Sequence, residues 1–357
     1  MILSQSGNLP GNIRIVLLSG LGDVVHGLPL VNAIKDASPG SHITWVVEPM
    51  PSGILEGHPS IDQIIVFRRR DGLSGVRQLR ADLAHAPRPD LTLNLNVYVK
   101  SVWPTILRRA PRRIGFGKER SFEGVHLASN EHLPVKPWSH TADMFMEFAE
   151  YLGISNVSRE WRIEFTEHEK AEQAKFFARF KNRPVSTIIP ASASIKKDWI
   201  PEKWALVANA LEQEFGFSVV IAGGPGEREK DIAQQIVARS SAKIAVAMAD
   251  SVRRLAWIVG GSSLVIAPDT GPVHIARALN VPVVGIYGHT NPWRVGPWNA
   301  FSDLWVDHYT ASGSPPDPSN REPKWHMMPT IEPSEVIGRI SVAVERYGAG
   351  RETVRRL

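Results

Sequence analysis

Four loops of this chain combine glycines with charged or hydroxyl side chains directly after buried, strand-like segments. The first is Ser19-Gly20-Leu21-Gly22-Asp23-Val24-Val25-His26, which follows the apolar run 13–18. Loops at the carboxyl ends of parallel strands bind ligands, and glycines let a substrate approach the backbone closely. Asp23 is therefore placed to act as a general base that takes the proton of an attacking hydroxyl. The alternative is that Asp23 only caps the helix that starts here.

The second loop is Pro268-Asp269-Thr270-Gly271-Pro272-Val273-His274, directly after the apolar run 264–267. Pro272 suits a first helical turn, so the backbone amides of Thr270 and Gly271 and the helix dipole are available to a diphosphate. A purely structural turn would explain the glycine and the proline. It would not explain Asp269 and His274, and the pattern therefore favours an anion-binding site.

The other two loops carry weaker signals of the same kind. Residues 190–199 include Ser192 and Lys197, whose hydroxyl and ammonium groups suit phosphate oxygens and the charge on a leaving diphosphate. Paired lysines before a helix are also common on solvated surfaces. Residues 222–227 end in Glu227, a carboxylate that could accept hydrogen bonds from the hydroxyls of a ribose.

Short apolar runs rich in branched residues alternate with helix-length polar stretches throughout the chain. This pattern is typical of parallel sheets buried on both faces, and it predicts an α/β fold. The expected strands lie at 13–18, 43–47, 64–67 and 91–95 in one series, and at 185–189, 219–222, 244–247, 264–267 and 283–287 in another. Helices are expected at 24–36, 167–181, 201–215, 226–239, 252–260, 272–279 and 333–347.

The two series of strands predict an architecture with two halves. The charged stretch 167–181 ends at Asn182-Arg183-Pro184, which predicts a domain boundary there. We expect one domain at 1–182 and another at 183–332, followed by a last segment at 333–357.

Composition excludes several other classes of protein. The 357 residues contain no cysteine, which removes disulfides, thiolate metal sites and cysteine nucleophiles. No apolar run reaches the length of a membrane span, and the first residues do not resemble a signal peptide. A cytoplasmic protein is therefore expected.

The net charge of +5 hides a strongly basic stretch. Residues 68–120 hold thirteen Lys and Arg residues against four Asp and Glu residues, a local charge of +9. This surplus predicts a partner rich in phosphate or carboxylate, or peripheral contact with an anionic inner-membrane surface. A merely solvated face is the alternative. Nucleic acid is not expected, because no DNA- or RNA-binding motif accompanies the arginines.

In order and spacing, the four loops resemble those of glycosyltransferase family 9, the heptosyltransferases of the lipopolysaccharide core. The resemblance covers nearly the whole chain and is most specific at 22–26, 197–199, 223–225 and 269–274. It implies the glycosyltransferase B architecture, in which two Rossmann-like domains face each other across a cleft. Residues 1–182 would bind the acceptor, residues 183–332 would bind the nucleotide sugar, and the segment 333–357 would pack back on the first domain. The resemblance also implies an inverting, metal-independent transfer from ADP-heptose to an anionic glycolipid, with no cofactor.

The resemblance also implies roles for individual residues. Asp23 would be the base and Lys197 would stabilise the leaving group. Donor binding would involve Ser192, Glu227, Asp269, Thr270, Gly271, Pro272 and His274. Acceptor binding would involve Gly22, His26, Arg112, Arg113 and Arg120.

Three other readings remain open from the sequence. A relative could use another nucleotide sugar for a different surface polysaccharide, or could bind a nucleotide sugar without turnover. A retaining enzyme with a nucleophilic carboxylate is also possible on this fold. An NAD-dependent oxidoreductase is disfavoured because the full dinucleotide fingerprint is missing.

Overall fold

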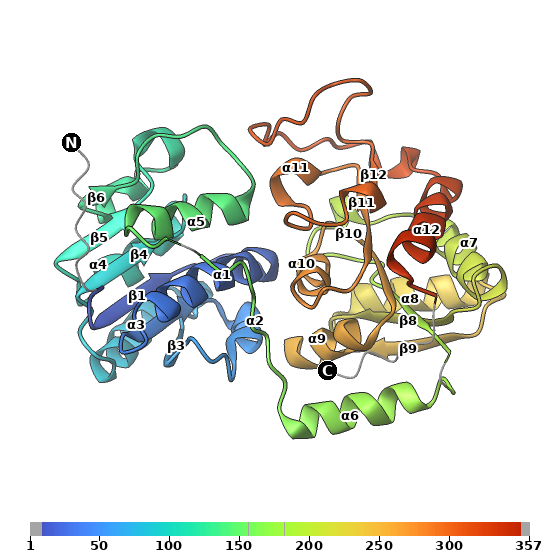
Figure 1. Ribbon diagram of the computed structural model, residues 1–357, viewed down its shortest axis with the longest axis horizontal. Coiled ribbons are helices and arrows are strands. Elements are labelled where there is room, and N and C mark those ends of the chain that lie inside the picture. Colours follow the sequence, from blue (N-terminus) through green and yellow to red (C-terminus); the bar gives the residue numbers. More distant parts are fainter. Residues whose placement is uncertain (1–8, 156, 182, 351–357) are drawn as a thin grey trace. The chain divides into compact units, whose positions relative to one another are not determined.

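Two parallel β-sheets, each with six strands, form the framework of the protein in the computed structural model (Figure 1). The structure describes residues 9–155, 157–181 and 183–350. Internal contacts divide the chain into two units, Met1–Glu164 and Phe165–Leu357, and each unit contains one sheet. The predicted α/β class with two Rossmann-like halves is confirmed.

The first sheet has the strand order β3-β2-β1-β4-β5-β6, and all of its strand pairs are parallel. The chain reverses its direction of winding between β1 and β4, the feature that defines a doubly wound sheet. Its strands are β1 (Asn12–Val16), β2 (His42–Val47), β3 (Gln63–Val66), β4 (Leu91–Asn94), β5 (Arg112–Gly115) and β6 (Glu131–His132).

Helices surround this sheet, and α1 lies beside α5 (Figure 1). Helix α1 is buried from Val24 to Ile34, which explains its almost uniformly apolar sequence. The helices are α1 (Leu21–Ala37), α2 (Pro49–Ser52), α3 (Gly72–His85), α4 (Val102–Ile106) and α5 (Thr141–Tyr151), with short 3₁₀ turns η1 (Gly53–Leu55), η2 (Arg69–Asp71), η3 (Val99–Ser101), η4 (Lys118–Arg120) and η5 (Val125–Ala128).

The second sheet repeats the doubly wound plan with the order β12-β11-β10-β7-β8-β9, again fully parallel. The reversal falls between β7 and β10. Its strands are β7 (Val185–Ile188), β8 (Ser218–Gly223), β9 (Ile244–Met248), β10 (Leu264–Pro268), β11 (Val283–Tyr287) and β12 (Trp305–Asp307).

The helices of the second unit fall into two contacting groups. Helix α7 contacts α8 and α12, whereas α9 contacts α10 and α6. The elements are α6 (Glu167–Ala178), α7 (Pro201–Gln213), α8 (Glu227–Arg239), α9 (Val252–Gly261), α10 (Gly271–Ala278), α11 (Pro292–Val295) and α12 (Pro333–Tyr347), with 3₁₀ turns η6 (Ile195–Lys197), η7 (Ser302–Leu304) and η8 (Met328–Thr330).

The division between the units falls after Glu164, earlier than the predicted boundary at 182. Helix α6 belongs to the second unit because its side chains bind α9. The Gln173 amide donates to the Trp257 carbonyl at 2.6 Å, and the Arg253 guanidinium pairs with the Glu169 carboxylate at 2.5 Å. The predicted boundary residue 182 itself lies outside the described residues.

Helix α12 has its main contacts in the second unit, with α7, β11, β12 and η7. Its buried face comprises Val336, Ile340 and Ala343. The packing of this segment on the first domain stays a prediction. Residues 351–357 of the predicted segment lie outside the described residues.

Candidate active site

Four loops gather at the carboxyl edge of the second sheet because their strands are parallel neighbours. They follow β7, β8, β10 and β11, which are consecutive in the order β11-β10-β7-β8. Three of these loops were singled out from the sequence. The fourth, after β11, was not predicted as part of the site.

Lys197, Asp269 and His274 form one cluster at this edge. The Lys197 ammonium donates to Asp269 Oδ2 at 2.6 Å and approaches the Asp269 carbonyl at 3.3 Å. His274 Nε2 lies 3.8 Å from Asp269 Oδ1. Burial would raise the pKa of Asp269, but the positive charge of Lys197 and the contact with His274 hold this pKa well below its usual value. Asp269 therefore stays ionised and fixes the position of the ammonium.

Thr270, Gly271 and Pro272 start helix α10 beside this cluster. Thr270 is the extended N-cap residue, its side chain makes no capping hydrogen bond, and Pro272 occupies the first turn. A first turn without a side-chain cap leaves amide donors for a bound group. Together with the lysine, this arrangement can bind an anion such as a diphosphate.

Ser192 shapes the loop after β7 and does not present a free hydroxyl. Its Oγ donates to the Ser194 carbonyl at 2.9 Å and accepts from the Ser194 amide at 3.1 Å. Arg228 ties the same loop to α8 through the Asp198 carboxylate and the Ser192 carbonyl. The structure thus shows an internal role for Ser192, and its contact with a diphosphate stays a prediction.

Two carboxylates follow the glycine loop after β8. Glu227 is almost fully exposed, at 90%, and pairs with Lys230 at 2.7 Å. Glu229 instead folds back on the loop: a Cβ atom at Gly224 would lie 2.6 Å from Glu229 Oε2. Sequence reasoning named Glu227 and did not consider Glu229. The signal was its N3 position, from which a glutamate reaches back to the start of its helix.

His289 and Trp325 complete this edge of the second sheet. The His289 ring donates from Nδ1 to the Lys324 carbonyl oxygen at 3.2 Å, and its ring centre lies 5.5 Å from that of Trp325. The Lys196 ammonium lies 3.3 Å above the Trp325 ring. Burial lowers the pKa of His289, and the nearby lysines lower it further. A half-exposed aromatic face therefore borders the loop after β7.

At the first sheet, Asp23 lies in the first turn of α1, after the carboxyl end of β1. It interacts electrostatically with Lys100, whose ammonium donates to Ser19 Oγ at 3.3 Å. Burial lowers the pKa of Lys100 and Asp23 opposes that shift. Lys100 follows β4, the strand next to β1, so the two loops form a small charged site.

Gly22 and His26 belong to the same turn as Asp23. Gly22 is half buried beside the aspartate. The His26 ring is buried and packs edge-on against the His140 ring at 5.0 Å between centres. His26 therefore supports the packing of α1 on α5.

Arg112, Arg113 and Arg120 are not brought to this site. Arg112 and Arg113 begin β5, at the opposite edge of the sheet from the carboxyl ends. Arg112 pairs with Glu131 at 2.8 Å, and Arg113 donates to the carbonyls of Ala128 and Ala110. Arg120 is buried in a two-pronged pair with Glu147 at 2.6 and 2.8 Å. All three have structural partners that the sequence did not reveal.

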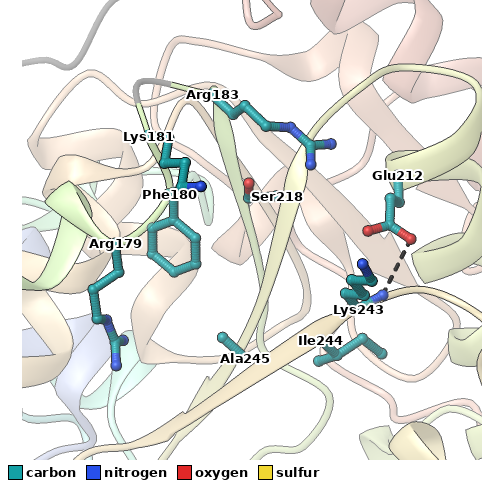
Figure 2. A pocket seen from close by; sticks show the side chains of 9 residues that line it. All are labelled: Arg179, Phe180, Lys181, Arg183, Glu212, Ser218, Lys243, Ile244 and Ala245. Carbon is teal, nitrogen blue, oxygen red and sulfur yellow. Dashed lines mark hydrogen bonds between the residues drawn. The ribbon is translucent and has the colours of Figure 1, made fainter.

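A separate hollow of about 380 Å³ lies at the opposite edge of the second sheet (Figure 2). Ser218 and Ile244, which begin β8 and β9, are among its lining residues. Arg179 and Arg183 also line it (Figure 2). Because ligand-binding loops follow the carboxyl ends of strands, this hollow is not the candidate active site.

The described residues contain neither a group of metal-ligand side chains nor a membrane-spanning helix. No three His, Asp or Glu side chains group there as potential ligands of a metal ion. None of the helices in these ranges is long and apolar enough to cross a bilayer.

Two parallel doubly wound units, each with polar loops at its carboxyl edge, match the two-domain glycosyltransferase B fold. The family model for glycosyltransferase family 9 (heptosyltransferase) matches residues 77–314, more than half of the chain. The protein therefore belongs to glycosyltransferase family 9 and is an enzyme of that family.

Named relatives agree with this assignment. The chain is 32% identical over 300 residues to the lipopolysaccharide core heptosyltransferase OpsX of Haemophilus influenzae, covering 83% of this chain and 84% of that protein. The family 9 glycosyltransferase of Veillonella parvula superposes with a TM-score of 0.72 at 26% identity, covering 82% and 84% of the two chains. Escherichia coli heptosyltransferase WaaC with ADP shares the fold, with a TM-score of 0.68 at 22% identity over 82% and 92%.

Proposed function

We propose that the protein transfers heptose from ADP-heptose to a lipopolysaccharide core acceptor, with inversion at the anomeric carbon and without a metal ion. The observation that carries the proposal is the meeting of Lys197, Asp269, His274 and the first turn of α10 at one sheet edge. This combination suits a nucleoside diphosphate. The names of OpsX and of WaaC with ADP favour heptose, lipopolysaccharide and ADP.

In the proposed reaction, the acceptor oxygen attacks the anomeric carbon while the bond to the ADP oxygen breaks. Asp23 takes the proton of the acceptor hydroxyl. Lys197 and the amides at the start of α10 stabilise the negative charge that builds on the leaving diphosphate. Asp269 holds the Lys197 ammonium in place before the donor arrives.

Other predicted residues take narrower parts in this proposal. Gly22 lets the acceptor approach the backbone beside Asp23, and His26 orients this turn through its packing on His140. For acidic groups of the acceptor, Lys100 is a better candidate than the arginines, because its charge interacts directly with Asp23. Glu229 joins Glu227 as a candidate partner of the ribose.

The first test is calorimetric binding of ADP, UDP, GDP and NAD in the presence of EDTA, followed by turnover of ADP-heptose with heptose-deficient lipopolysaccharide. Selective ADP binding and turnover in EDTA would support the proposal. A preference for UDP or GDP would retain glycosyl transfer but remove heptose. Binding without turnover of any sugar nucleotide would identify a non-catalytic protein, and retention of anomeric configuration in the product would contradict the mechanism.

A further inference from the structure

Six large apolar side chains are exposed on three adjoining segments of the first unit. The segments are η3 with the preceding Tyr98, helix α4, and η5 with the preceding Phe122. Contacts link η3, α4 and η5 to one another. We call these side chains the aromatic patch. Its members are Tyr98, Val99, Trp103, Ile106, Phe122 and Leu127, with exposures from 38% to 80%.

The patch is held together by local contacts. The Tyr98 ring stacks on the Phe122 ring with 5.3 Å between centres. The Phe122 amide donates to the Val97 carbonyl at 2.7 Å, and the Val99 amide donates to the Glu123 carboxylate at 3.1 Å. These contacts hold η3 against the approach to η5, and helix α4 contacts both 3₁₀ turns. The exposed apolar side chains therefore lie on neighbouring segments, and contiguous exposed apolar surface commonly marks an interaction site.

The charge of the surrounding chain indicates the kind of partner. Residues 97–127 hold seven Lys and Arg residues against two glutamates. Arg112 and Arg120 are paired with carboxylates outside this stretch, Glu131 and Glu147. Three positive charges in excess remain. Exposed aromatic and aliphatic side chains within a basic surrounding suit the interface of an anionic bilayer, where tryptophan and tyrosine are enriched.

The patch also adjoins the candidate acceptor site. Val99 and Lys100 are consecutive, and the Lys100 ammonium contacts Ser19 and interacts with Asp23. A surface resting on a bilayer here would bring membrane lipid close to the turn that carries Asp23. This placement suits an acceptor that is itself anchored in the membrane.

We infer that the aromatic patch docks the enzyme on an anionic phospholipid bilayer and so presents a membrane-bound glycolipid to Asp23. The relevance for catalysis rests on the proposed lipopolysaccharide acceptor. The docking itself does not depend on it. Apolar side chains enter the interface while arginines and lysines meet the lipid phosphates.

Vesicle co-sedimentation of the full chain tests the docking without any sugar substrate. Vesicles of phosphatidylcholine with about 30% phosphatidylglycerol should bind the protein, and pure phosphatidylcholine should bind it at least roughly fivefold less. Raising the salt from about 0.1 M to about 0.5 M should weaken the binding. Equal binding to both vesicles, or no binding, would overturn the inference.

Substitutions locate the surface. Trp103→Glu and Leu127→Glu should each reduce vesicle binding roughly fivefold or more, because a charge replaces an inserted apolar group. Leu206→Glu is the matched control, since Leu206 is an exposed leucine of α7 in the second unit and its change should leave binding unaltered. Equal losses in all three variants would contradict this surface, as would a dimer in ultracentrifugation that Trp103→Glu dissociates.

ADP binding separates this inference from the proposed function. Trp103→Glu and Leu127→Glu should bind ADP as the unchanged protein does, which also shows that they fold. Loss of vesicle binding with intact ADP binding supports the docking surface. If ADP does not bind to any of these proteins, the proposed donor is wrong and the vesicle results still decide the docking.

Discussion

The carboxyl edges of the two sheets differ in how far their polar groups are fixed. In the second unit, Lys197 and Asp269 form a short, largely buried ion pair, and Arg228 ties down the adjoining loop. In the first unit, Asp23 and Lys100 interact electrostatically, and the Lys100 ammonium contacts Ser19 Oγ at the longer distance of 3.3 Å. A fixed edge suits a constant ligand, here a nucleoside diphosphate, whereas the looser edge leaves more of its shape to the acceptor.

The largest expected effect tests the looser edge. Asp23→Asn removes the proposed base but keeps the shape of the side chain, so kcat should fall by about 10²- to 10⁴-fold while ADP binding persists. Steady-state turnover and calorimetry measure both. Asp36→Asn is the matched control because Asp36 lies at the other end of the same helix, where it pairs with Arg162. Unchanged turnover in Asp23→Asn would leave Asp23 as a helix-start residue only.

Arg120 tests whether the first unit uses its arginines for folding. Arg120→Met leaves the buried Glu147 carboxylate without its partner, which should lower the free energy of unfolding by about 3–5 kcal/mol. Arg112→Met breaks a more exposed pair and should cost about 1 kcal/mol or less. Urea denaturation measures both. If Arg120→Met were as stable as Arg112→Met but lost acceptor binding, this result would support the acceptor-binding role predicted for Arg120.

The sequence predicted the sheets well because their strands are buried apolar runs. The starts of all nine expected strands lie within one residue of the strands found. Three strands were missed: β5 because it starts with the polar pair Arg112 and Arg113, and β6 and β12 because they have only two and three residues. Periodicity cannot detect a strand that is short or polar.

The prediction of the site was limited because the sequence does not show which side chains become partners. Loop position along the chain was enough to group Lys197 with Asp269, since parallel neighbouring strands deliver their loops to one edge. Loop position could not show that Arg120 would pair with Glu147, which lies twenty-seven residues from Arg120 and thirty-five residues from Arg112. Long-range ion pairs of this kind leave no local sequence pattern. For the same reason, the sequence could not show that the Lys196 ammonium lies over the Trp325 ring.

Lys197 tests the fixed edge. Lys197→Met should lower kcat by about 10²- to 10³-fold, because it removes a positive charge placed for the leaving diphosphate, and should also weaken ADP binding. Lys196→Met is the adjacent comparison. Its ammonium lies over the Trp325 ring and not on Asp269, so its loss should have a smaller effect on kcat. Equal effects of the two changes would mean that the loop contributes only its overall charge.

The smallest expected effect separates the two carboxylates beside the glycine loop. Glu229→Gln should weaken ADP binding roughly tenfold, since a hydrogen bond to a charged acceptor contributes about 1.5 kcal/mol or more, while Glu227→Gln should have little effect. Comparing ADP with 2′-deoxy-ADP distinguishes ribose recognition from loop folding. If the substituted residue binds the ribose hydroxyl, the variant should no longer distinguish ADP from 2′-deoxy-ADP. If the residue is purely structural, the variant should bind both ligands more weakly by the same factor. Loss of discrimination in Glu227→Gln instead would mean that the exposed carboxylate turns toward the donor when it binds.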